Sequence, residues 1–171
     1  MKRPRGGRAA PAVEILVESA RWKTRGGVRP LLRRAITEAA AALSTRAALS
    51  TRSIELAIVL TNDSAIRKLN RTWRGKDEPT NVLAFPAPQP ASPRGSLGDI
   101  VIAYETLARE AKAEGRPFSH HLAHLAVHGF LHLCGYDHDT DRQAASMEGL
   151  EVAVLARLRI PNPYIAHGRG G

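Results

Sequence analysis

The chain of 171 residues has a single cysteine and no long apolar run. The lone Cys134 excludes an intrachain disulfide, which is consistent with a reducing compartment. No window approaches the ~18 apolar residues that a membrane span needs. The basic N-terminus is not followed by the apolar stretch of a signal peptide, because Glu14 interrupts the run from Ala12 to Val17. We therefore expect a soluble cytoplasmic protein without a membrane partner.

Acidic residues are scarce relative to basic ones. Asp and Glu number 16 against 25 Lys and Arg, which gives a net charge of +9, and residues 1–34 hold ten of the basic residues with only two glutamates. Such a surplus is typical of proteins that bind a polyanion, either nucleic acid or an acidic membrane surface. A solvated basic face with a loose arm explains the same charge equally well, so the charge alone does not decide between these interpretations.

The rest of the composition is that of a globular domain with a core. Hydrophobic residues make up 43% of the chain and charged residues 24%, which excludes wholesale disorder, and the length fits about one domain. We expect a flexible basic arm at 1–11, a single domain at 12–158 and a C-terminal tail at 159–171. Four prolines in residues 86–96 predict an irregular loop within that domain.

Apolar periodicity predicts an α+β fold, in which a small mixed sheet is packed with about five helices. Asn62 or Asp63 can cap the second helix, and Thr140 with Gln143 forms a capping box for the last one. Gly135 fits the left-handed position that ends the fourth helix. The expected strands are 13–17, 54–60, 82–85 and 100–103, and the expected helices are 30–43, a segment from 63 that includes 66, 69 and 73, 107–113, 119–134 and 141–158.

Histidines cluster in one short segment, since six of the seven lie between positions 120 and 138. His128 and His132 are four residues apart in a predicted helix, which separates them by only ~40° of rotation and ~6 Å of rise, so both imidazoles can reach one ion. Gly135 permits a sharp turn after which His138 can close on the same ion. Three neutral nitrogens suit Zn²⁺ best, although copper, nickel and iron accept the same ligands. We predict one Zn²⁺ per chain at the end of a buried helix.

No fourth protein ligand is evident beside these histidines. Cys134 lies ~240° round the helix from His128 and is expected to be a small buried hydrophobic residue. Three ligands with an open position are typical of a catalytic zinc rather than a structural one. His120 and His124 continue the same helical stripe as polar rim groups or supports of the ligands, and Asp137 is either such a support or a turn residue.

The spacing H-x3-H-x5-H also occurs in metzincin proteases, which carry a glutamate directly after the first histidine as the general base. Here that position is Gly129, which has no side chain to accept a proton. A bound metal can still lower the pKa of water towards ~7. A zinc-dependent protease or amidase is therefore one function that the sequence leaves open, and it ranks behind the two that are described below.

Three motifs in order resemble those of the YbeY family, which are single-domain metal-dependent endoribonucleases of ribosomal RNA maturation. The residues HGFLHLCGYDH at 128–138 resemble the family's signature. Leu69-Asn70 through Arg74, followed by PTNVLAFP at 79–86, resembles its LN…R…PTDVLSFP segment, and LGDIVI at 97–102 resembles its LGDI-type strand. The resemblance covers about residues 12–158.

The resemblance implies a zinc held by His128, His132 and His138. It places the family's functional arginine at Arg74, whose guanidinium can bind two phosphate oxygens and so makes Arg74 the candidate catalytic residue. The implied activity is single-strand-specific, zinc-dependent endonucleolytic cleavage in 16S rRNA 3′ end processing and ribosome quality control. The implied partners are ribosomal RNA and the small ribosomal subunit with its proteins.

The chain departs from the family pattern at two positions. Asn81 stands where the family usually has Asp, and Ala84 stands where it usually has Ser. Asn81 loses a charge but keeps a hydrogen-bonding carbonyl, so a role that needs a carboxylate is not expected there. Asn81 and, on the histidine stripe, His124 are the candidate substrate-binding residues. The altered Asn81 and the basic N-terminal region keep a second function open, that of a ribosome-assembly or RNA-binding factor with a mainly structural zinc.

Overall fold

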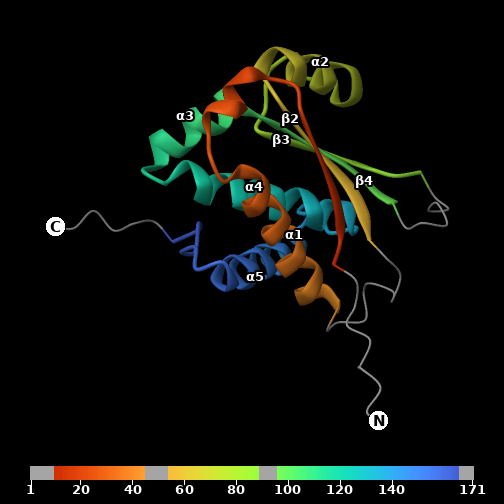
Figure 1. Cartoon of the computed structure of the whole chain (residues 1–171). Helices are drawn as coiled ribbons and strands as arrows, with labels where there is room; N and C mark the ends of the chain where they lie inside the picture. Colours follow the sequence, from red (N-terminus) through yellow and green to blue (C-terminus); the bar gives the residue numbers. More distant parts are fainter. Residues whose placement is uncertain (1–9, 45–53, 89–95, 166–171) are drawn as a thin grey trace, which may run out of the picture.

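A four-stranded mixed sheet forms the centre of the computed structural model, which describes residues 10–44, 54–88 and 96–165 (Figure 1). Three of its strands run parallel, and the last pairs antiparallel at one edge. The strands lie in the order β1 (Ala12–Val17), β2 (Glu55–Thr61), β4 (Ser96–Ala103) and β3 (Val82–Pro86). The mixed sheet in a single α+β domain confirms the predicted fold class.

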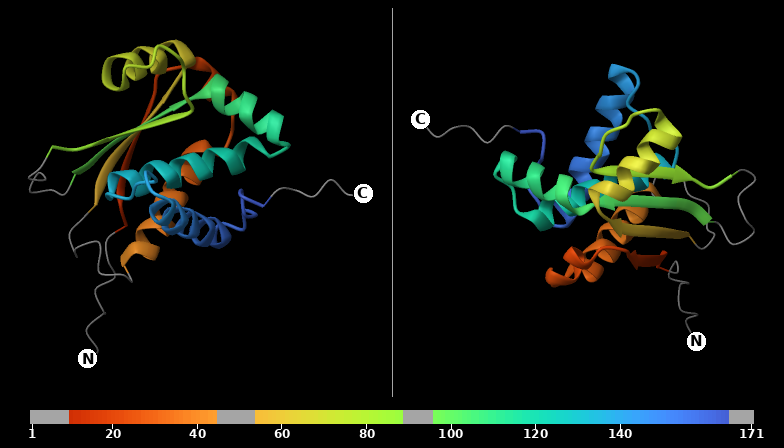
Figure 2. Two further views of the ribbon diagram at one scale, coloured as in Figure 1. Left: turned by 180° about the vertical axis from the view of Figure 1, so that it is seen from behind. Right: turned by 90° about the horizontal axis from the view of Figure 1, so that it is seen from above.

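Five α-helices surround the sheet within the described residues. α1 (Val28–Ser44) and α4 (Phe118–Leu133) lie across one face, and α5 (Asp141–Arg157) packs against both of them (Figures 1 and 2). α2 (Asp63–Arg74) covers part of the opposite face, while α3 (Tyr104–Glu114) packs beside α4. The sequence pattern does not predict the short 3-10 helix η1 (Ala20–Thr24).

The larger core lies between the sheet and the helices α1, α4 and α5. Ten of the sixteen residues of α4 are buried, as its nearly continuous apolar surface predicts. A Cβ atom at Gly129 would lie 2.9 Å from Cγ2 of Ile100 in β4, so only glycine allows the helix to approach the sheet this closely. α4 runs below the sheet towards the end where β3 ends and β4 begins (Figures 1 and 2).

A smaller core lies on the opposite face of the sheet, beneath α2. Ile66 of α2 packs with Leu83 of β3 and Val101 of β4. At the far end of the helix, the ring of Trp73 meets that of Phe85 edge-on, with 6.2 Å between the ring centroids. α2 and α4 therefore lie on different sides of the sheet (Figure 1).

The prediction that β4 starts at residue 100 is wrong, because the strand already begins at Ser96. Gly98 has a φ of +126°, a conformation that residues with a side chain rarely adopt, and the register between β2 and β4 shifts in this region. Asp99 lies within the strand, opposite Ala57 on one side and Phe85 on the other. From the sequence alone, a glycine followed by an acidic residue indicates a turn. In the structure, Gly98 and Asp99 both lie in a strand with a bulge.

The start of α3 also precedes its predicted position, since the helix begins at Tyr104 rather than at residue 107. Its cap comes from another helix: the Asp63 carboxylate accepts hydrogen bonds from the backbone N–H and the hydroxyl of Thr106, at 3.0 and 2.7 Å. Asn62, the other candidate cap, accepts from the backbone N–H of Ala65 at 2.9 Å and caps α2 as predicted.

Parts of three predicted segments lie outside the described residues: 1–9 of the arm, 89–95 of the loop and 166–171 of the tail. The ends of the predicted loop belong to strands, since Pro86 ends β3 and Ser96 begins β4. None of the helices in the described part of the chain has the length and apolar character that crossing a membrane requires.

Replacing Gly98 by alanine should destabilise the fold. The new Cβ would collide with the backbone carbonyl of Phe85, and the positive φ would strain any side chain. We expect a loss of at least about 2 kcal/mol in the free energy of unfolding, measured by chemical denaturation. Gly149→Ala is the control, because no atom lies within 4 Å of its new Cβ, and it should be neutral or stabilising by about 0.5–1 kcal/mol. Equal effects of the two substitutions would contradict the bulged strand.

Candidate metal centre

The turn after α4 sets the position of the third histidine. Gly135 has a φ of +93°, its N–H donates to the carbonyl of His132 at 3.0 Å, and the N–H of Tyr136 donates to the carbonyl of Leu131 at 3.0 Å. These two bonds form a Schellman motif, which confirms the predicted role of Gly135 in ending the helix. The chain reverses direction at this point and carries His138 back towards the helix.

The other end of the same turn is held by the capping box of α5. The hydroxyl of Thr140 accepts from the N–H of Gln143 at 3.1 Å, and the side chain of Gln143 accepts from the N–H of Thr140 at 3.2 Å, as predicted. The carboxylate of Asp137 accepts from the backbone N–H of His138 at 2.7 Å and lies 4.0 Å from Nδ1 of the same residue, so its roles in the turn and as a support of His138 both stay predictions. The segment between the two helices is therefore short and fixed at both ends.

The three predicted ligands lie together at this turn. One ring nitrogen from each of His128, His132 and His138 lies within 4.8 Å of the other two. The Nε2 atoms of His128 and His132 are 3.1 Å apart. The first two side chains are half-buried and His138 is exposed, so one side of this histidine triad is open to solvent.

The donor set of the triad fits a small tetrahedral cation. Nδ1 of His128 is hydrogen-bonded to a carboxylate at 2.5 Å, so its Nε2 carries the lone pair that faces Nε2 of His132. Ligands of a tetrahedral ion with bonds of ~2.0–2.1 Å stand ~3.3 Å apart, close to the spacing of these two nitrogens. Burial, followed by the neighbouring His128 and His138, lowers the pKa of His132, so its neutral form is favoured.

The carboxylate behind His128 belongs to Glu151 of α5, which is completely buried. Its Oε1 accepts from Nδ1 of His128, and its Oε2 accepts a hydrogen bond from the hydroxyl of Tyr164 and lies 3.5 Å from Nε2 of His124. Burial raises the pKa of Glu151, but the hydrogen bonds from His124, His128 and Tyr164 outweigh it and lower the pKa to about 2. The group is therefore an ionised carboxylate with a hydrogen-bonding partner on each oxygen.

His124 joins this network rather than the triad. Its Nε2 lies 3.2 Å from the Tyr164 hydroxyl, and its ring meets the Tyr164 ring edge-on. Cys134 is half-buried next to the turn and is not among the grouped ligand atoms. Burial raises the pKa of its thiol to about 12, which agrees with the expected small hydrophobic residue.

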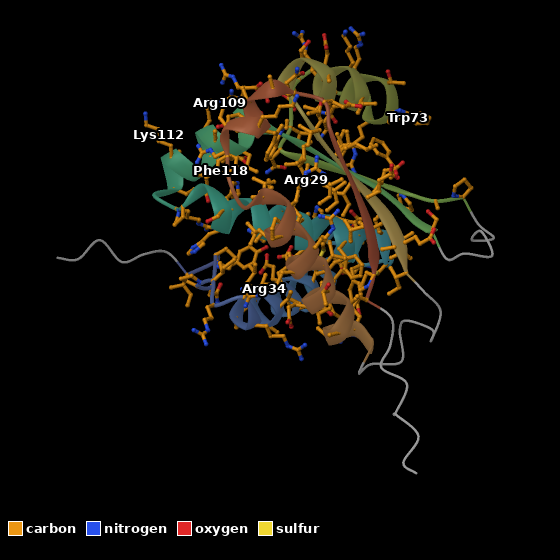
Figure 3. The ribbon with its side chains drawn as sticks, viewed as in Figure 1. Arg29, Arg34, Trp73, Arg109, Lys112 and Phe118 are labelled. Carbon is orange, nitrogen blue, oxygen red and sulfur yellow. The ribbon has the colours of Figure 1, made fainter. Side chains whose placement is uncertain are left out.

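Arg74 lies apart from the triad. It is the last residue of α2, on the other side of the sheet from α4, and its side chain is exposed. Within the described residues, no hydrogen bond or ion pair joins it to the histidines. Figure 3 shows its neighbour Trp73, which is 69% exposed, projecting from the same end of the helix. Arg74 and the triad therefore belong to helices on different faces of the sheet.

Asn81 is held inside the fold by hydrogen bonds at both ends of its amide. Its Nδ2 donates to Glu110 of α3 at 2.8 Å, and its Oδ1 accepts from the backbone N–H of Val82 at 2.7 Å. Glu110 is also 3.0 Å from Nε2 of the buried His121. Asn81 thus connects the start of β3 to α3 and α4, and its proposed contact with substrate stays a prediction.

Sequence reasoning missed three residues of these networks: Glu151, Tyr164 and His121. Glu151 falls on the predicted inner face of the last helix, beside Met147 and Leu150. A lone carboxylate within an apolar face signals a buried partner, since unpaired buried charge is costly. Tyr164 carries no comparable signal, because the two prolines before it indicate only that the helix has ended.

Comparison with known proteins identifies close relatives. The model of the family described as "Endoribonuclease YbeY" matches residues 22–159. The protein named Endoribonuclease YbeY from Nitrobacter hamburgensis is 52% identical over 168 residues, which cover 94% of this chain and 86% of that protein. Its namesake from Rhodopseudomonas palustris is 52% identical over 165 residues, covering 94% and 85%. A solution structure of a Thermotoga maritima protein shares the fold, with a TM-score of 0.54 at 21% identity over 93% of this chain and 99% of that one.

The Glu110 network predicts a pH-dependent stability. Burial raises the pKa of Glu110, but hydrogen bonds from His121 and Asn81, with the charges of His121 and Arg109, hold it below the ordinary 4.5. A carboxyl whose pKa is lowered on folding contributes stability above its unfolded pKa and loses that contribution as the pH falls through the folded value. Glu110→Gln should therefore lower the free energy of unfolding by about 1 kcal/mol at pH 7. It should have no effect at a pH below the pKa of Glu110 in the folded protein.

Urea denaturation of both proteins over a series of pH values measures this difference. The control is Glu148→Gln, which removes an exposed carboxylate from α5 and should leave stability unchanged at every pH. A difference between wild type and Glu110→Gln that stays constant from neutral to acid pH would refute the role given to this carboxylate.

Proposed function

Because the chain belongs to the YbeY family of endoribonucleases, we propose that its histidine triad binds one Zn²⁺ ion and that this centre cleaves single-stranded regions of ribosomal RNA. The observation that carries the proposal is the convergence of three imidazoles from α4 and the following turn, two of them with Nε2 atoms 3.1 Å apart. The protein acts as a hydrolase on RNA phosphodiester bonds. The choice of zinc and of single-stranded ribosomal RNA is the proposed part.

The triad has the properties that such a reaction needs. Neutral imidazole ligands carry no charge of their own, and the single carboxylate of Glu151 behind His128 would offset only part of the charge of a divalent cation, so the centre would attract a phosphate group. When bound, Zn²⁺ supplies Lewis-acid chemistry at the phosphodiester. His138 is exposed while His128 and His132 are half-buried, so substrate can approach from the side of the turn. The packed helix α4 holds the other side closed.

Arg74 is proposed as the catalytic residue that stabilises charge on the phosphate. Its guanidinium is exposed at the end of α2, and no partner within the described residues neutralises it. A free guanidinium can bind two phosphate oxygens at once. Because α2 and α4 lie on different faces of the sheet, the RNA would have to extend from the end of α2 to the turn after α4 to contact both.

The natural setting of this reaction is proposed to be maturation of the 16S rRNA 3′ end on the small ribosomal subunit, and quality control of ribosomes, in the cytoplasm. The net charge of +9 supports an RNA partner, because basic side chains bind the phosphates of the backbone. Most of this positive charge falls within residues 1–34. His124 and Asn81 are proposed as secondary contacts with substrate. Each is already hydrogen-bonded inside the fold, so such a contact requires the substrate to replace or extend an existing bond.

A protease using the same triad is disfavoured by the packing of α4. Gly129 occupies the position of the metzincin general base, and a side chain there would collide with Ile100 rather than reach a substrate. The assembly-factor alternative, with a mainly structural zinc, differs from the nuclease in one measurable respect: it binds RNA without cutting it. The substitutions below separate the two.

Replacing His132 by alanine should remove both zinc and activity. With one of three ligands lost, we expect the zinc content to fall well below one ion per chain and the cleavage of ribosomal RNA to fall at least about 100-fold. Metal analysis of the purified protein and a cleavage assay measure the two effects, and circular dichroism checks the fold. His120→Ala on the same helix is the control, since His120 lies outside the triad. Retained cleavage by metal-free His132→Ala would refute the proposed centre.

Replacing Arg74 by alanine should leave zinc binding intact and slow cleavage by about 100-fold, the usual loss when one charge-stabilising donor is removed. Arg71→Ala is the matched control, because Arg71 is exposed on the same helix and has only a 4.0 Å contact with Asp77. Arg74→Lys should restore part of the rate, because it keeps the charge but not the two-pronged geometry. Equal rates for Arg74→Ala and Arg71→Ala would show that Arg74 has no special role.

A further inference from the structure

We propose that Glu151 and Tyr164 are a positioning pair for the metal centre: Glu151 fixes the ring of His128, and Tyr164, from the segment after α5, fixes Glu151. The inference rests on the proposed zinc site and adds to it two residues that lie outside the triad. It also gives the segment after the last helix a function in metal binding.

The side chain of Glu151 has no access to solvent, although a carboxylate is strongly hydrated in water. It is completely buried in the layer between α4 and α5, on the face of α5 that otherwise carries Met147, Leu150 and Val154. A buried carboxylate is costly unless it is hydrogen-bonded, and an apolar residue of similar size would usually serve packing as well or better. Its hydrogen-bonding partners must therefore account for a carboxylate at this position.

The first partner is Nδ1 of His128, 2.5 Å from Oε1 of Glu151. An imidazole has two tautomers, and a carboxylate at Nδ1 selects the one that carries the proton there. The lone pair of His128 is then on Nε2, the atom that faces Nε2 of His132 at 3.1 Å. The same bond prevents rotation of the ring, and the negative charge behind it makes Nε2 a stronger donor to a cation.

The second partner is the hydroxyl of Tyr164, which donates to Oε2 of Glu151. α5 ends at Arg157, and the chain then turns back, so that Tyr164 reaches a residue thirteen positions earlier. Two further bonds hold this return: the carbonyl of Pro163 accepts from the guanidinium of Arg116, and the side chain of Asn162 accepts from the N–H of Tyr164. The returning segment is thus tied to the connection between α3 and α4 as well as to Glu151.

Two substitutions in the full-length chain test the pair. Glu151→Gln keeps the size and shape of the side chain but removes its charge, and Tyr164→Phe removes only the hydroxyl. Zn²⁺ affinity is measured by competition with a chelator. We expect a loss of about 10- to 100-fold for Glu151→Gln, and a smaller loss of about 3- to 10-fold for Tyr164→Phe. Bound Co²⁺ should show a shifted visible absorption spectrum in both variants, because the His128 ligand is less well oriented.

Matched controls separate positioning from general destabilisation. Glu14→Gln removes an exposed carboxylate from β1, and Tyr104→Phe removes a hydroxyl whose hydrogen bond is with Arg25, outside the triad network. Both should bind Zn²⁺ as tightly as the wild type. Tyr164 is 45% exposed, so Tyr164→Phe should fold normally, and thermal unfolding of the metal-free proteins verifies this. The affinity of Tyr164→Phe therefore tests the inference even if Glu151→Gln folds poorly.

Unchanged Zn²⁺ affinity and an unchanged Co²⁺ spectrum in well-folded Tyr164→Phe and Glu151→Gln would overturn the inference, as would equal losses in the control variants. The measurement is independent of RNA cleavage. If wild-type protein binds Zn²⁺ and the variants bind it less tightly, but RNA is not cut, the proposed nuclease activity fails while the positioning pair stands. If wild-type protein binds no Zn²⁺, both proposals fail.

Discussion

The close contact between α4 and β4 is the constraint on which the metal centre depends. Gly129 lies against Ile100 with no room for a side chain. The glycine therefore lets the backbone of α4 pack directly on the sheet, and this contact sets the distance between the helix and β4. His128 precedes this contact and His132 follows it within one turn, which makes the relative position of their rings a property of the core rather than of a loop. The same packing leaves α5 in reach of α4 from the opposite side, where Glu151 meets His128.

Much of the fold follows from local sequence, and its exceptions have tertiary causes. α4 is recognisable because it is apolar nearly all round and is ended by Gly135, and α5 because Thr140 and Gln143 cap it. The start of α3 is not recognisable, because its cap is a carboxylate from α2, 43 residues away in sequence. The start of β4 is hidden for a different reason, since a glycine that elsewhere marks a turn here forms a bulge in a paired strand.

The candidate site divides in the same way. The spacing of His128 and His132 on a helix, with His138 after a glycine turn, is enough to bring the three rings together. The support of the triad cannot be derived from spacing, since Glu151 and Tyr164 reach it through the packing of α5 and a reversal of the chain. The role proposed for Arg74 rests on the resemblance to the family's motif, and only the three-dimensional structure shows that α2 and α4 lie on different faces of the sheet.

All three candidate ligands fall within the eleven residues from 128 to 138. Closing so short a loop costs little chain entropy, so an unfolded chain can also gather these imidazoles around a cation. A ligand that binds both states stabilises the native one only by the difference between its two affinities. The rise in melting temperature on adding zinc should therefore be smaller than the affinity of the folded protein alone would give. The rise that is observed measures chiefly what only the folded state provides, namely the buried carboxylate and the rigid helix.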